Sequence, residues 1–420
     1  MGEVREGYKM TELGVVPSEW EVLTVDDIAN KIVGGGTPSR ENESFYNGDI
    51  PWVTVKDMKG SFYQEDAQEF ITEAALKNSA SNLIEPNNII VATRIALGRG
   101  FINTKEVAIN QDLKAIYLND TKVKNEYFLY WYLQNAEFIK GLGSGSTVKG
   151  IRVEQLKSLQ LPIPNIGEQQ KIASILSTVD EQVDETEQLI VKTKELKKGL
   201  MQQLLTKGIG HTEFKQTELG EIPNEWEIKD LIDIGTFSKG KGIAKKDLSD
   251  KGMPCILYGQ LYTKYKERID KVTSYTEIEV KNPVIGMKND LLIPSSGETA
   301  IDIATASALN VDNIYIGGDI NLFTPFIEVD SNFLSLQINS TRKSELAKLA
   351  QGSSVYHLYS SSLENFSVVL PSLEEQQKIA QILSTVDEQI DIYEQEKVKY
   401  EELKKGLMQQ LLTGQIRVKI

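Results

Sequence analysis

The spacing of apolar residues predicts two long amphipathic helices. Glu168 to Thr206 contains no proline and a single glycine, and its apolar positions fall at Ile172, Leu176, Val179, Val183 and Ile190, then at Leu196, Leu200 and Leu204. The first steps of 4, 3, 4 and then 7 residues, with Thr186 in between, are typical of a coiled-coil seam. A second stretch has the same pattern at Ile379, Leu383, Val386 and Ile390, then at Tyr393, Tyr400, Leu403 and Leu407.

The predicted helices are long for a globular protein. About 38 residues at ~1.5 Å each would span nearly 60 Å. A lone helix of that length would leave its apolar stripe exposed, so we expect the two copies to pair with each other. The alternative for such a stripe is plain dimerisation of the protein, or packing of each helix on its own domain.

The chain contains an internal duplication. TELGVVPSEWEV (Thr11 to Val22) returns as TELGEIPNEWEI (Thr217 to Ile228), and EQQKIASILSTVDEQVD (Glu168 to Asp184) returns as EQQKIAQILSTVDEQID (Glu375 to Asp391). KELKKGLMQQLLT also returns, as EELKKGLMQQLLT at Glu401 to Thr413. The shifts of 206 and 207 residues agree, and they far exceed the ~20 to 50 residues of solenoid repeats. Each copy is therefore expected to be a whole domain with an attached helix.

The sequence between the repeated blocks diverges while its frame persists. GSTVKGIRVEQLKSLQLPIP (Gly145 to Pro164) and GSSVYHLYSSSLENFSVVLPS (Gly352 to Ser372) share a GS start, a central leucine and a proline end. A common scaffold with different contents is what two recognition modules for different targets would look like. The expected fold is α+β, with two similar mixed α/β domains separated by two long antiparallel coiled-coil helices in a pseudo-twofold repeat.

Composition fits two globular units in a reducing compartment. The 420 residues are 40% apolar and 25% charged, as in folded soluble proteins. No run approaches the ~18 apolar residues of a membrane helix, and we expect no secretory signal because the N-terminal residues contain no apolar segment. Cys255 is the only cysteine, so no internal disulfide can form and a cytoplasmic setting is expected.

Charge is segregated along the chain. The net charge of −14 argues against indiscriminate binding of nucleic acid. Arg94 to Lys124 nevertheless holds six basic residues against three acidic ones, and Gly235 to Gly252 holds five lysines against two aspartates. Four acidic residues gather between Glu181 and Glu187 instead. Local basic faces are therefore compatible with the acidic total.

Signatures of catalysis are missing from the sequence. Two histidines, His211 and His357, with one cysteine cannot supply an ordinary four-ligand zinc site. GTFSKGKG at Gly235 to Gly242 has the skeleton of a phosphate loop, but Gly242 stands where the magnesium-binding Ser or Thr is needed. We interpret it as a basic loop, and we expect no catalytic residue and no metal ligand in this chain.

The repeated motifs resemble a known family. The EQQKIA-x-ILSTVDEQ block, the LKKGLMQQLLT helix end and the TELG-x-x-P-x-EWE segment occur twice, and GGGTPS, IPWVTVKD and INQD occur in the first half. Together they look like the specificity subunit of type I restriction-modification systems, and the resemblance covers essentially the whole chain. The second half departs from the pattern, because GKGIAKKD replaces a GGTPS-like string and no NQD appears.

The resemblance implies a non-catalytic DNA-recognition subunit with four parts. Residues 1–167 would form an N-terminal segment and target recognition domain 1, and residues 168–210 a central coiled-coil helix. Residues 211–374 would form a linker and target recognition domain 2, and residues 375–420 a C-terminal coiled-coil helix. Each domain would read one half of a bipartite, asymmetric site on double-stranded DNA.

The resemblance also implies partner proteins. Two modification subunits would methylate adenine from S-adenosylmethionine, and restriction subunits would add ATP- and Mg-dependent translocation and cleavage. No cofactor is expected in this subunit itself. The paired helices would set the spacer between the half-sites and dock the modification subunits.

Candidate DNA-binding residues combine cations for phosphates with side chains able to discriminate base edges. Those of the first domain are Thr37, Ser39, Arg40, Lys56, Arg94, Arg99, Lys149 and Arg152. Those of the second are Lys239, Lys241, Lys245, Lys246, Tyr258, Gln260, Ser296, Tyr356 and His357. Each lysine has the competing interpretation of an ordinary solvated side chain. The tryptophans Trp20, Trp52, Trp131 and Trp226 are interpreted as core residues.

Three other functions stay open at this point. A specificity subunit could serve a methyltransferase that has no nuclease, and neighbouring genes would reveal this. A scaffold with two protein-binding domains on a coiled-coil stem would show no salt-dependent affinity for DNA. A catalytic methyltransferase is disfavoured by the missing motifs.

Overall fold

The computed structural model describes residues 5–145 and 148–419, and they form two compact units. The first unit combines residues up to Glu187 with those from Gln395 onward, and the second runs from Gln188 to Glu394. Each unit thus contains one mixed α/β domain together with part of each long helix. The units are described separately below.

The first unit contains thirteen strands and five helices of one to three turns among its described residues. Its strands are β1 (Tyr8–Thr11), β2 (Gly14–Pro17), β3 (Glu21–Thr24), β4 (Ala29–Gly34), β5 (Ile50–Val53), β6 (Tyr63–Gln64), β7 (Phe70–Ile71), β8 (Asn82–Ile84), β9 (Ile89–Ala92), β10 (Gly100–Asn103), β11 (Val107–Ile109), β12 (Leu113–Leu118) and β13 (Gln160–Ile163). Its short helices are α1 (Val25–Ile28), α2 (Glu73–Lys77), α3 (Asn125–Gln134), α4 (Ala136–Gly141) and α5 (Val153–Lys157), with a 3₁₀ turn η1 (Glu43–Tyr46).

The second unit repeats this plan with local additions. Its strands are β14 (Phe214–Thr217), β15 (Gly220–Pro223), β16 (Glu227–Asp230), β17 (Gly235–Lys239), β18 (Met253–Ile256), β19 (Arg268–Ile269), β20 (Tyr275–Thr276), β21 (Ile285–Gly286), β22 (Leu291–Pro294), β23 (Ser296–Gly297), β24 (Ser307–Leu309), β25 (Ile314–Ile316), β26 (Ile320–Pro325), β27 (Tyr356–His357) and β28 (Ser367–Leu370). Its short helices are α7 (Tyr258–Thr263), α8 (Ala300–Ile303), α9 (Ser331–Asn339), α10 (Lys343–Lys348) and α11 (Ser360–Leu363), with 3₁₀ turns η2 (Leu231–Asp233) and η3 (Lys245–Asp247).

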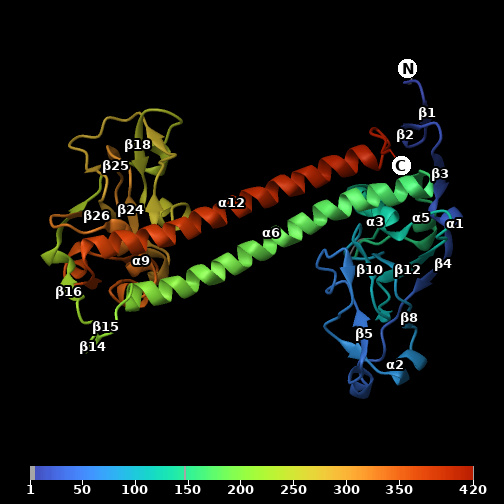
Figure 1. The fold of residues 1–420 in the computed structure, drawn as a ribbon, viewed down its shortest axis with the longest axis horizontal. Helices are drawn as coiled ribbons and strands as arrows, with labels where there is room; N and C mark the ends of the chain where they lie inside the picture. Colours follow the sequence, from blue (N-terminus) through green and yellow to red (C-terminus); the bar gives the residue numbers. More distant parts are fainter. Residues whose placement is uncertain (1–4, 146–147, 420) are drawn as a thin grey trace. The chain divides into compact units, whose positions relative to one another are not determined.

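Strand order is the same in the two domains. The five-stranded sheets run β4-β12-β9-β10-β6 and β17-β26-β22-β24-β19, and the four-stranded sheets run β7-β5-β11-β8 and β20-β18-β25-β21. Helix α3 packs on β10 in the first domain (Figure 1), and α9 packs on the matching strand β24 in the second. The predicted α+β class and internal repeat are confirmed.

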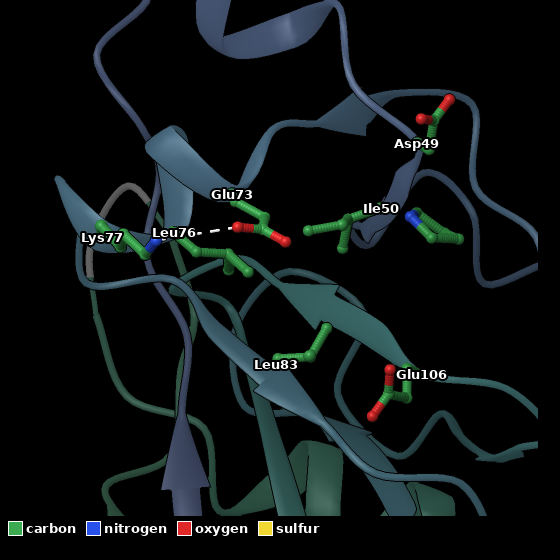
Figure 2. Close-up of a pocket in the computed structure, with 8 residues that line it drawn as sticks. Asp49, Ile50, Glu73, Leu76, Lys77, Leu83 and Glu106 are labelled. Atoms are coloured by element: carbon green, nitrogen blue, oxygen red, sulfur yellow. Dashed lines mark ion pairs between the residues drawn. The ribbon is translucent and has the colours of Figure 1, made fainter.

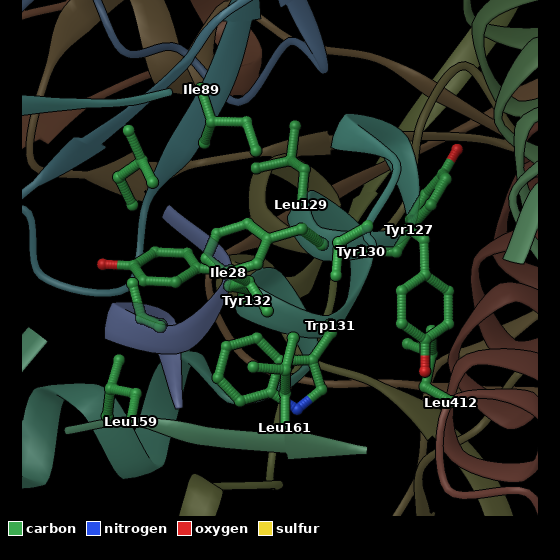
Figure 3. Packing of buried hydrophobic residues seen from close by; sticks show 14 of the residues in the cluster. Ile28, Ile89, Tyr127, Leu129, Tyr130, Trp131, Tyr132, Leu159, Leu161 and Leu412 are labelled. Carbon is green, nitrogen blue, oxygen red and sulfur yellow. The ribbon is translucent and has the colours of Figure 1, made fainter. Parts of the chain in front are cut away.

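Buried aromatic side chains fill the core of the first domain. Tyr127, Leu129, Trp131 and Tyr132 of α3 pack with Ile28, Ile89 and Leu161 (Figure 3). All four tryptophans are at most 6% exposed, which confirms their prediction as core residues. The same cluster contains Ile172 and Leu176 from one long helix and Leu411 from the other. The domain and its helix pair therefore share one hydrophobic core.

The two long helices are α6 (Ile166–Lys207) and α12 (Leu373–Leu411). In the first unit Asp180 of α6 pairs with Lys404 of α12, and Glu187 with Lys397. In the second unit Lys197 of α6 pairs with Asp387 of α12 at 2.8 Å, and Lys194 with Glu394 at 2.6 Å. As residue numbers rise on α6 they fall on α12, so the helices pair antiparallel within each unit.

The predicted stripe is correct except at Leu196 and Leu403, since beyond Ile190 the side chains of Leu200 and Leu407 are half-buried and that of Leu204 is 7% exposed. Among the nine expected seam residues, Val183 and Val386 are half-buried and the other seven are at most 8% exposed. Leu196 and Leu403, however, are 55% and 48% exposed, so their expected place in the stripe is wrong. The seam continues instead through Thr186, Ile190, Thr193 and Lys197, whose side chain is only 15% exposed. The 3 and 4 residue spacing of the seam continues to Leu200 and Leu204, and the ion-paired Lys197 takes the position at which the sequence pattern suggested Leu196.

Two leucines of α6 give a matched test of this packing. Leu176 is fully buried, so we expect Leu176→Ala to lower the free energy of unfolding by about 3 kcal/mol. Leu196→Ala removes the same atoms from an exposed position, and we expect a change within about 0.5 kcal/mol. Urea unfolding of the full chain measures both. Equal losses for the two variants would contradict the observed seam.

The EQQ motif joins each long helix to its domain. The buried amide of Gln169 donates to the carbonyl of Pro164 at 2.8 Å and accepts from the backbone N–H of Lys124 at 2.8 Å. Gln376 makes the equivalent bonds with Pro371 at 2.9 Å and with Asp330 at 3.0 Å. Lys124 and Asp330 are the N-caps of α3 and α9. One glutamine thus fixes the starts of two helices in each unit.

The glutamate that precedes this glutamine in each EQQ motif binds the tryptophan of the EWE motif. The indole N–H of Trp20 donates to Glu168 at 3.1 Å, and that of Trp226 donates to Glu375 at 3.1 Å. Both carboxylates have a further partner from the segment after the opposite helix, Arg417 in the first unit and His211 in the second. The two motifs that recur in the sequence are therefore partners in space.

Candidate nucleic-acid interface

A basic groove lies on the first domain. It has a volume of about 610 Å³ and is lined by Val55, Lys56, Ile95, Ala96, Leu97, Arg99, Lys140 and Lys149. Four of these side chains are cationic and none is acidic. Such a surface attracts phosphates and can position a nucleic-acid backbone. Three of the predicted residues, Lys56, Arg99 and Lys149, are brought together here from segments far apart in the sequence.

The loop after β9 supplies one wall of the groove. Its ends are joined by a bond from the N–H of Ala92 to the carbonyl of Arg99 at 3.0 Å. The guanidinium of Arg99 donates to the carbonyl of Met58 at 2.9 Å. The N–H of Ile95 donates to the carbonyl of Lys149 at 3.2 Å, which ties the loop to the opposite wall. These hydrogen bonds fix the backbone that carries the cations of the groove.

Arg94 precedes the groove residue Ile95 and is oriented by a buried carboxylate. Its guanidinium lies 3.4 Å from Asp112, whose side chain is 9% exposed while that of Arg94 is 49% exposed. The side-chain amide of Asn110 donates to Asp112 at 3.1 Å. The INQD string therefore supplies an orienting acid for an arginine that can reach a base edge. Arginine binds guanine through two parallel hydrogen bonds in the major groove.

The GGGTPSR loop packs against β11, the strand that leads into the INQD string. A Cβ at Gly35 would lie 2.0 Å from the carbonyl oxygen of Ile109 in β11, so only glycine allows this approach. Thr37 hydrogen-bonds to Gln111. Arg40 donates twice to Glu69, at 3.0 and 2.7 Å, and this raises the pKa of Arg40. Ser39 accepts from the N–H of Glu41. The guanidinium of Arg40 is thus already bound to Glu69, and its contact with DNA stays a prediction.

Arg152 lies apart from the groove lining. It is the exposed N-cap residue of α5, and no ion pair is recorded for it among the described residues. Gly145, earlier in the chain, has φ +131°, and its counterpart Gly352 has φ +132°. A side chain would be strained at either position. The two frames therefore share a left-handed backbone conformation at this glycine.

The second domain has different residues at the position of Arg94. Thr93 donates its N–H to the carbonyl of Asp112 at 2.8 Å, and Ser295 donates to the carbonyl of Asp319 at 2.8 Å. Arg94 forms an antiparallel bridge with Gly150, and Ser296 pairs with His357 in the same way. Ser296 is therefore the counterpart of Arg94, on a backbone fixed by equivalent main-chain hydrogen bonds.

Three of the predicted residues of the second domain meet at this point. The hydroxyl of Ser296 lies 3.1 Å from Nδ1 of His357, and Tyr356 pairs with Gly297 across the two strands. Lys239 lies 3.8 Å from Asp319. Lys241, Lys245 and Lys246 are exposed. This surface combines hydroxyl, imidazole and phenol groups where the first domain presents guanidinium groups.

Tyr258 and Gln260 lie on α7, which has no counterpart in the first domain. Gln260 accepts from the N–H of Leu257 at 2.9 Å and donates to the hydroxyl of Ser274 at 2.6 Å. Both ends of this amide are engaged within the domain. Tyr258 is exposed and its ring lies 6.5 Å from that of Tyr262. Their contacts with DNA stay predictions.

Five residues of the groove lining were not predicted from the sequence, and two of them, Lys140 and Ile95, bear on its chemistry. Lys140 lies on α4, and its place in the groove depends on how that helix packs. Ile95 was overlooked because an isoleucine carries no charge or hydrogen-bonding group. The chain offers one signal for it, its place between Arg94 and Arg99 in ATRIALGRG.

A second hollow of the first domain has the opposite charge. It has a volume of about 470 Å³, and Asp49, Glu73 and Glu106 surround a floor of Ile50, Leu76 and Leu83 (Figure 2). Lys77 pairs with Glu73 at 3.7 Å, within the helix. The carboxylates that line this hollow would repel the phosphates of DNA. The basic groove is therefore the better candidate for DNA.

Within residues 5–145 and 148–419, no group of three or more His, Cys, Asp or Glu side chains is arranged to hold a metal ion. Over the same described residues, no helix is both long and apolar enough to span a membrane.

Comparison with protein families finds one model that matches twice. The model is described as the type I restriction modification DNA specificity domain, and it matches residues 17–195 and 223–402. The two matches account for most of the chain. They also coincide with the two copies of the internal repeat.

Individual relatives and solved structures agree with this match. The chain is 28% identical to the putative type I restriction enzyme MjaX specificity subunit of Methanocaldococcus jannaschii, over 99% of this chain and 97% of that protein. It is 30% identical to the EcoR124I/EcoR124II specificity subunit of Escherichia coli, over 41% of this chain and 44% of that protein. The crystal structure of a type I S subunit from M. genitalium has the same fold, with TM-score 0.60 and 18% identity over 96% of this chain and 98% of that one.

Proposed function

The chain belongs to the type I restriction modification DNA specificity family, and from this premise we propose that each of its domains reads one half of a bipartite, asymmetric DNA site. The observation that carries the proposal is the groove of Lys56, Arg99, Lys140 and Lys149, which has four cations and no carboxylate. Phosphates bound there would position Arg94 over base edges.

The second domain would read a different sequence with the same scaffold. Ser296 and His357 replace Arg94 and Gly150 on equivalent strands, so hydrogen bonds of another geometry meet the second half-site. This supports two separate readers. An asymmetric site follows from two dissimilar surfaces.

Partner subunits complete the proposed activity. Two modification subunits would dock on the paired helices and methylate adenines with S-adenosylmethionine. Restriction subunits would supply ATP- and Mg²⁺-dependent translocation and cleavage, in the cytoplasm where the DNA lies. In this chain the helices α6 and α12 would set the distance between the two half-sites.

Exchange of one domain tests the proposal. Residues 28–161 are replaced by the equivalent region of another specificity subunit, and the variant is expressed with its modification subunits. We expect only one half of the methylated site to change, because the other reader is intact. Single-molecule sequencing of methylated adenines in the host genome measures this. A change in both halves, or in neither, would contradict separate readers.

The converse exchange is the matched control. Replacing the variable region of the second domain should alter the other half-site and leave the first unchanged. A protein-binding scaffold predicts no salt-dependent affinity for DNA with the partners present, whereas phosphate contacts predict a steep dependence.

A further inference from the structure

Ile95 has a backbone conformation that its side chain disfavours. Its φ is +64°, in the left-handed region. The other non-glycine residues with positive φ among the described part of the chain are Asn87, Asn282, Asn289, Asn313 and Asp319. Asparagine and aspartate tolerate this region, whereas a β-branched residue there is an outlier. A glycine or asparagine would suit the loop better than the isoleucine that is present.

Packing does not explain the isoleucine either. The Ile95 side chain is 63% exposed, so it adds little to the core. Its backbone is held by the bond to Lys149 and by the adjacent bridge between Arg94 and Gly150. The side chain lines the basic groove among Lys56, Arg99 and Lys149. Strained residues that the surrounding structure holds in place cluster at functional sites.

We propose that Ile95 contacts the C5-methyl group of a thymine in the first half-site. The inference rests on the proposed function and names one base that it reads. The thymine methyl is the apolar group that a base pair presents in the major groove. The cations of the groove would bind phosphates, and Arg94 beside Ile95 would bind a neighbouring base edge. The apolar side chain at the loop tip then has a partner in the complex.

The second domain supplies an internal control. The counterpart of Ile95 is Gly297, which follows Ser296 as Ile95 follows Arg94. Glycine has no side chain to contact a methyl group. The structure therefore predicts a thymine-methyl contact of this kind in the first half-site and not at the equivalent point of the second.

The experiment removes one methyl group at a time. The full chain is assembled with its modification subunits, and the recognition site is read from methylated adenines in the host genome. Duplexes with that site are then made with each thymine replaced by deoxyuridine, and their dissociation constants are measured. Loss of one buried methyl should weaken binding about fourfold at a single position of the first half-site.

Ile95→Asn separates recognition from folding. Asparagine accepts the left-handed conformation, so its melting temperature should equal or exceed that of the wild type. The variant should bind thymine and deoxyuridine duplexes equally, with the affinity that the wild type has for the deoxyuridine duplex. Ile278→Asn, at an exposed isoleucine of the second domain, should keep the full preference for thymine.

The outcomes are distinct. If the wild type prefers thymine at no position of the first half-site, or if Ile95→Asn retains the preference, the inference is wrong while the proposed function stands. Equal weakening of thymine and deoxyuridine duplexes by Ile95→Asn, without a preference in the wild type, would indicate a wedge between base pairs and overturn the methyl contact. Absence of any bipartite methylated site would defeat the proposed function itself.

Discussion

Arg417→Ala is expected to lower the free energy of unfolding by about 3 kcal/mol, because it leaves a buried carboxylate without its cation. Arg417 donates to both oxygens of Glu168, from Nε at 2.6 Å and from Nη2 at 2.9 Å. The Glu168 side chain is 1% exposed and that of Arg417 is 34% exposed. Within residues 5–145 and 148–419, the indole N–H of Trp20 is the only further side-chain donor to that carboxylate. Urea unfolding of the full chain gives the measurement.

Two further variants sharpen this test. Lys419→Ala, at an exposed residue two positions away, should change the free energy of unfolding by less than about 0.5 kcal/mol. Arg417→Ala combined with Glu168→Gln should be less destabilised than Arg417→Ala alone, because a neutral amide needs no cation. If the double variant loses as much as the two single variants together, the ion pair is not what stabilises this junction.

Lengthening both long helices is expected to increase the distance between the two halves of the recognition site. Four residues inserted after Glu187 in α6 and four after Glu394 in α12 add ~6 Å to the pair. Since base pairs are spaced by ~3.4 Å, the spacer between the half-sites should grow by one or two base pairs. Methylation at the original spacing should be lost, and single-molecule sequencing of the genome would reveal the new spacing.

The matched control places the same residues in a loop. Four residues inserted between Glu12 and Leu13, in the exposed turn that joins β1 to β2, lengthen no helix of the pair, so the spacer should keep its length. If lengthening α6 and α12 leaves the spacer unchanged, the helices do not determine it. Loss of methylation at every spacing, with the chain still folded, would also count against a spacer length set by the helices alone.

The duplication made much of the fold predictable. Three repeated blocks with agreeing shifts predicted two equivalent domains, and the apolar steps up to Ile190 predicted the helix pair. Leu196 and Leu403 were assigned to the seam wrongly, because the seam positions beside them are occupied by Lys197 and Lys404, which a search for apolar residues passes over. Their carboxylate partners, Asp387 and Asp180, lie on the other helix and become visible only in the structure.

The candidate site was predictable in its chemistry more than in its geometry. Arg94 and Arg99 were recognisable as cations among small residues, and both lie at the groove loop. The engagement of Arg40 by Glu69 and of Gln260 by Ser274 could not be inferred, because these partners are distant in the sequence. Ile95 was missed because its distinctive feature is a backbone angle.

The backbone at Arg94 and at Ser296 is held by equivalent main-chain hydrogen bonds. Ile151 donates to the carbonyl of Thr93 at 2.9 Å, and Leu358 donates to that of Ser295 at 3.1 Å. The same main-chain frame therefore carries different side chains at equivalent positions. Replacing Arg94 would leave the buried carboxylate of Asp112 without its cation, whereas Ser296 faces the imidazole of His357 and no carboxylate. A change of side chain is therefore expected to cost more folding free energy at Arg94 than at Ser296.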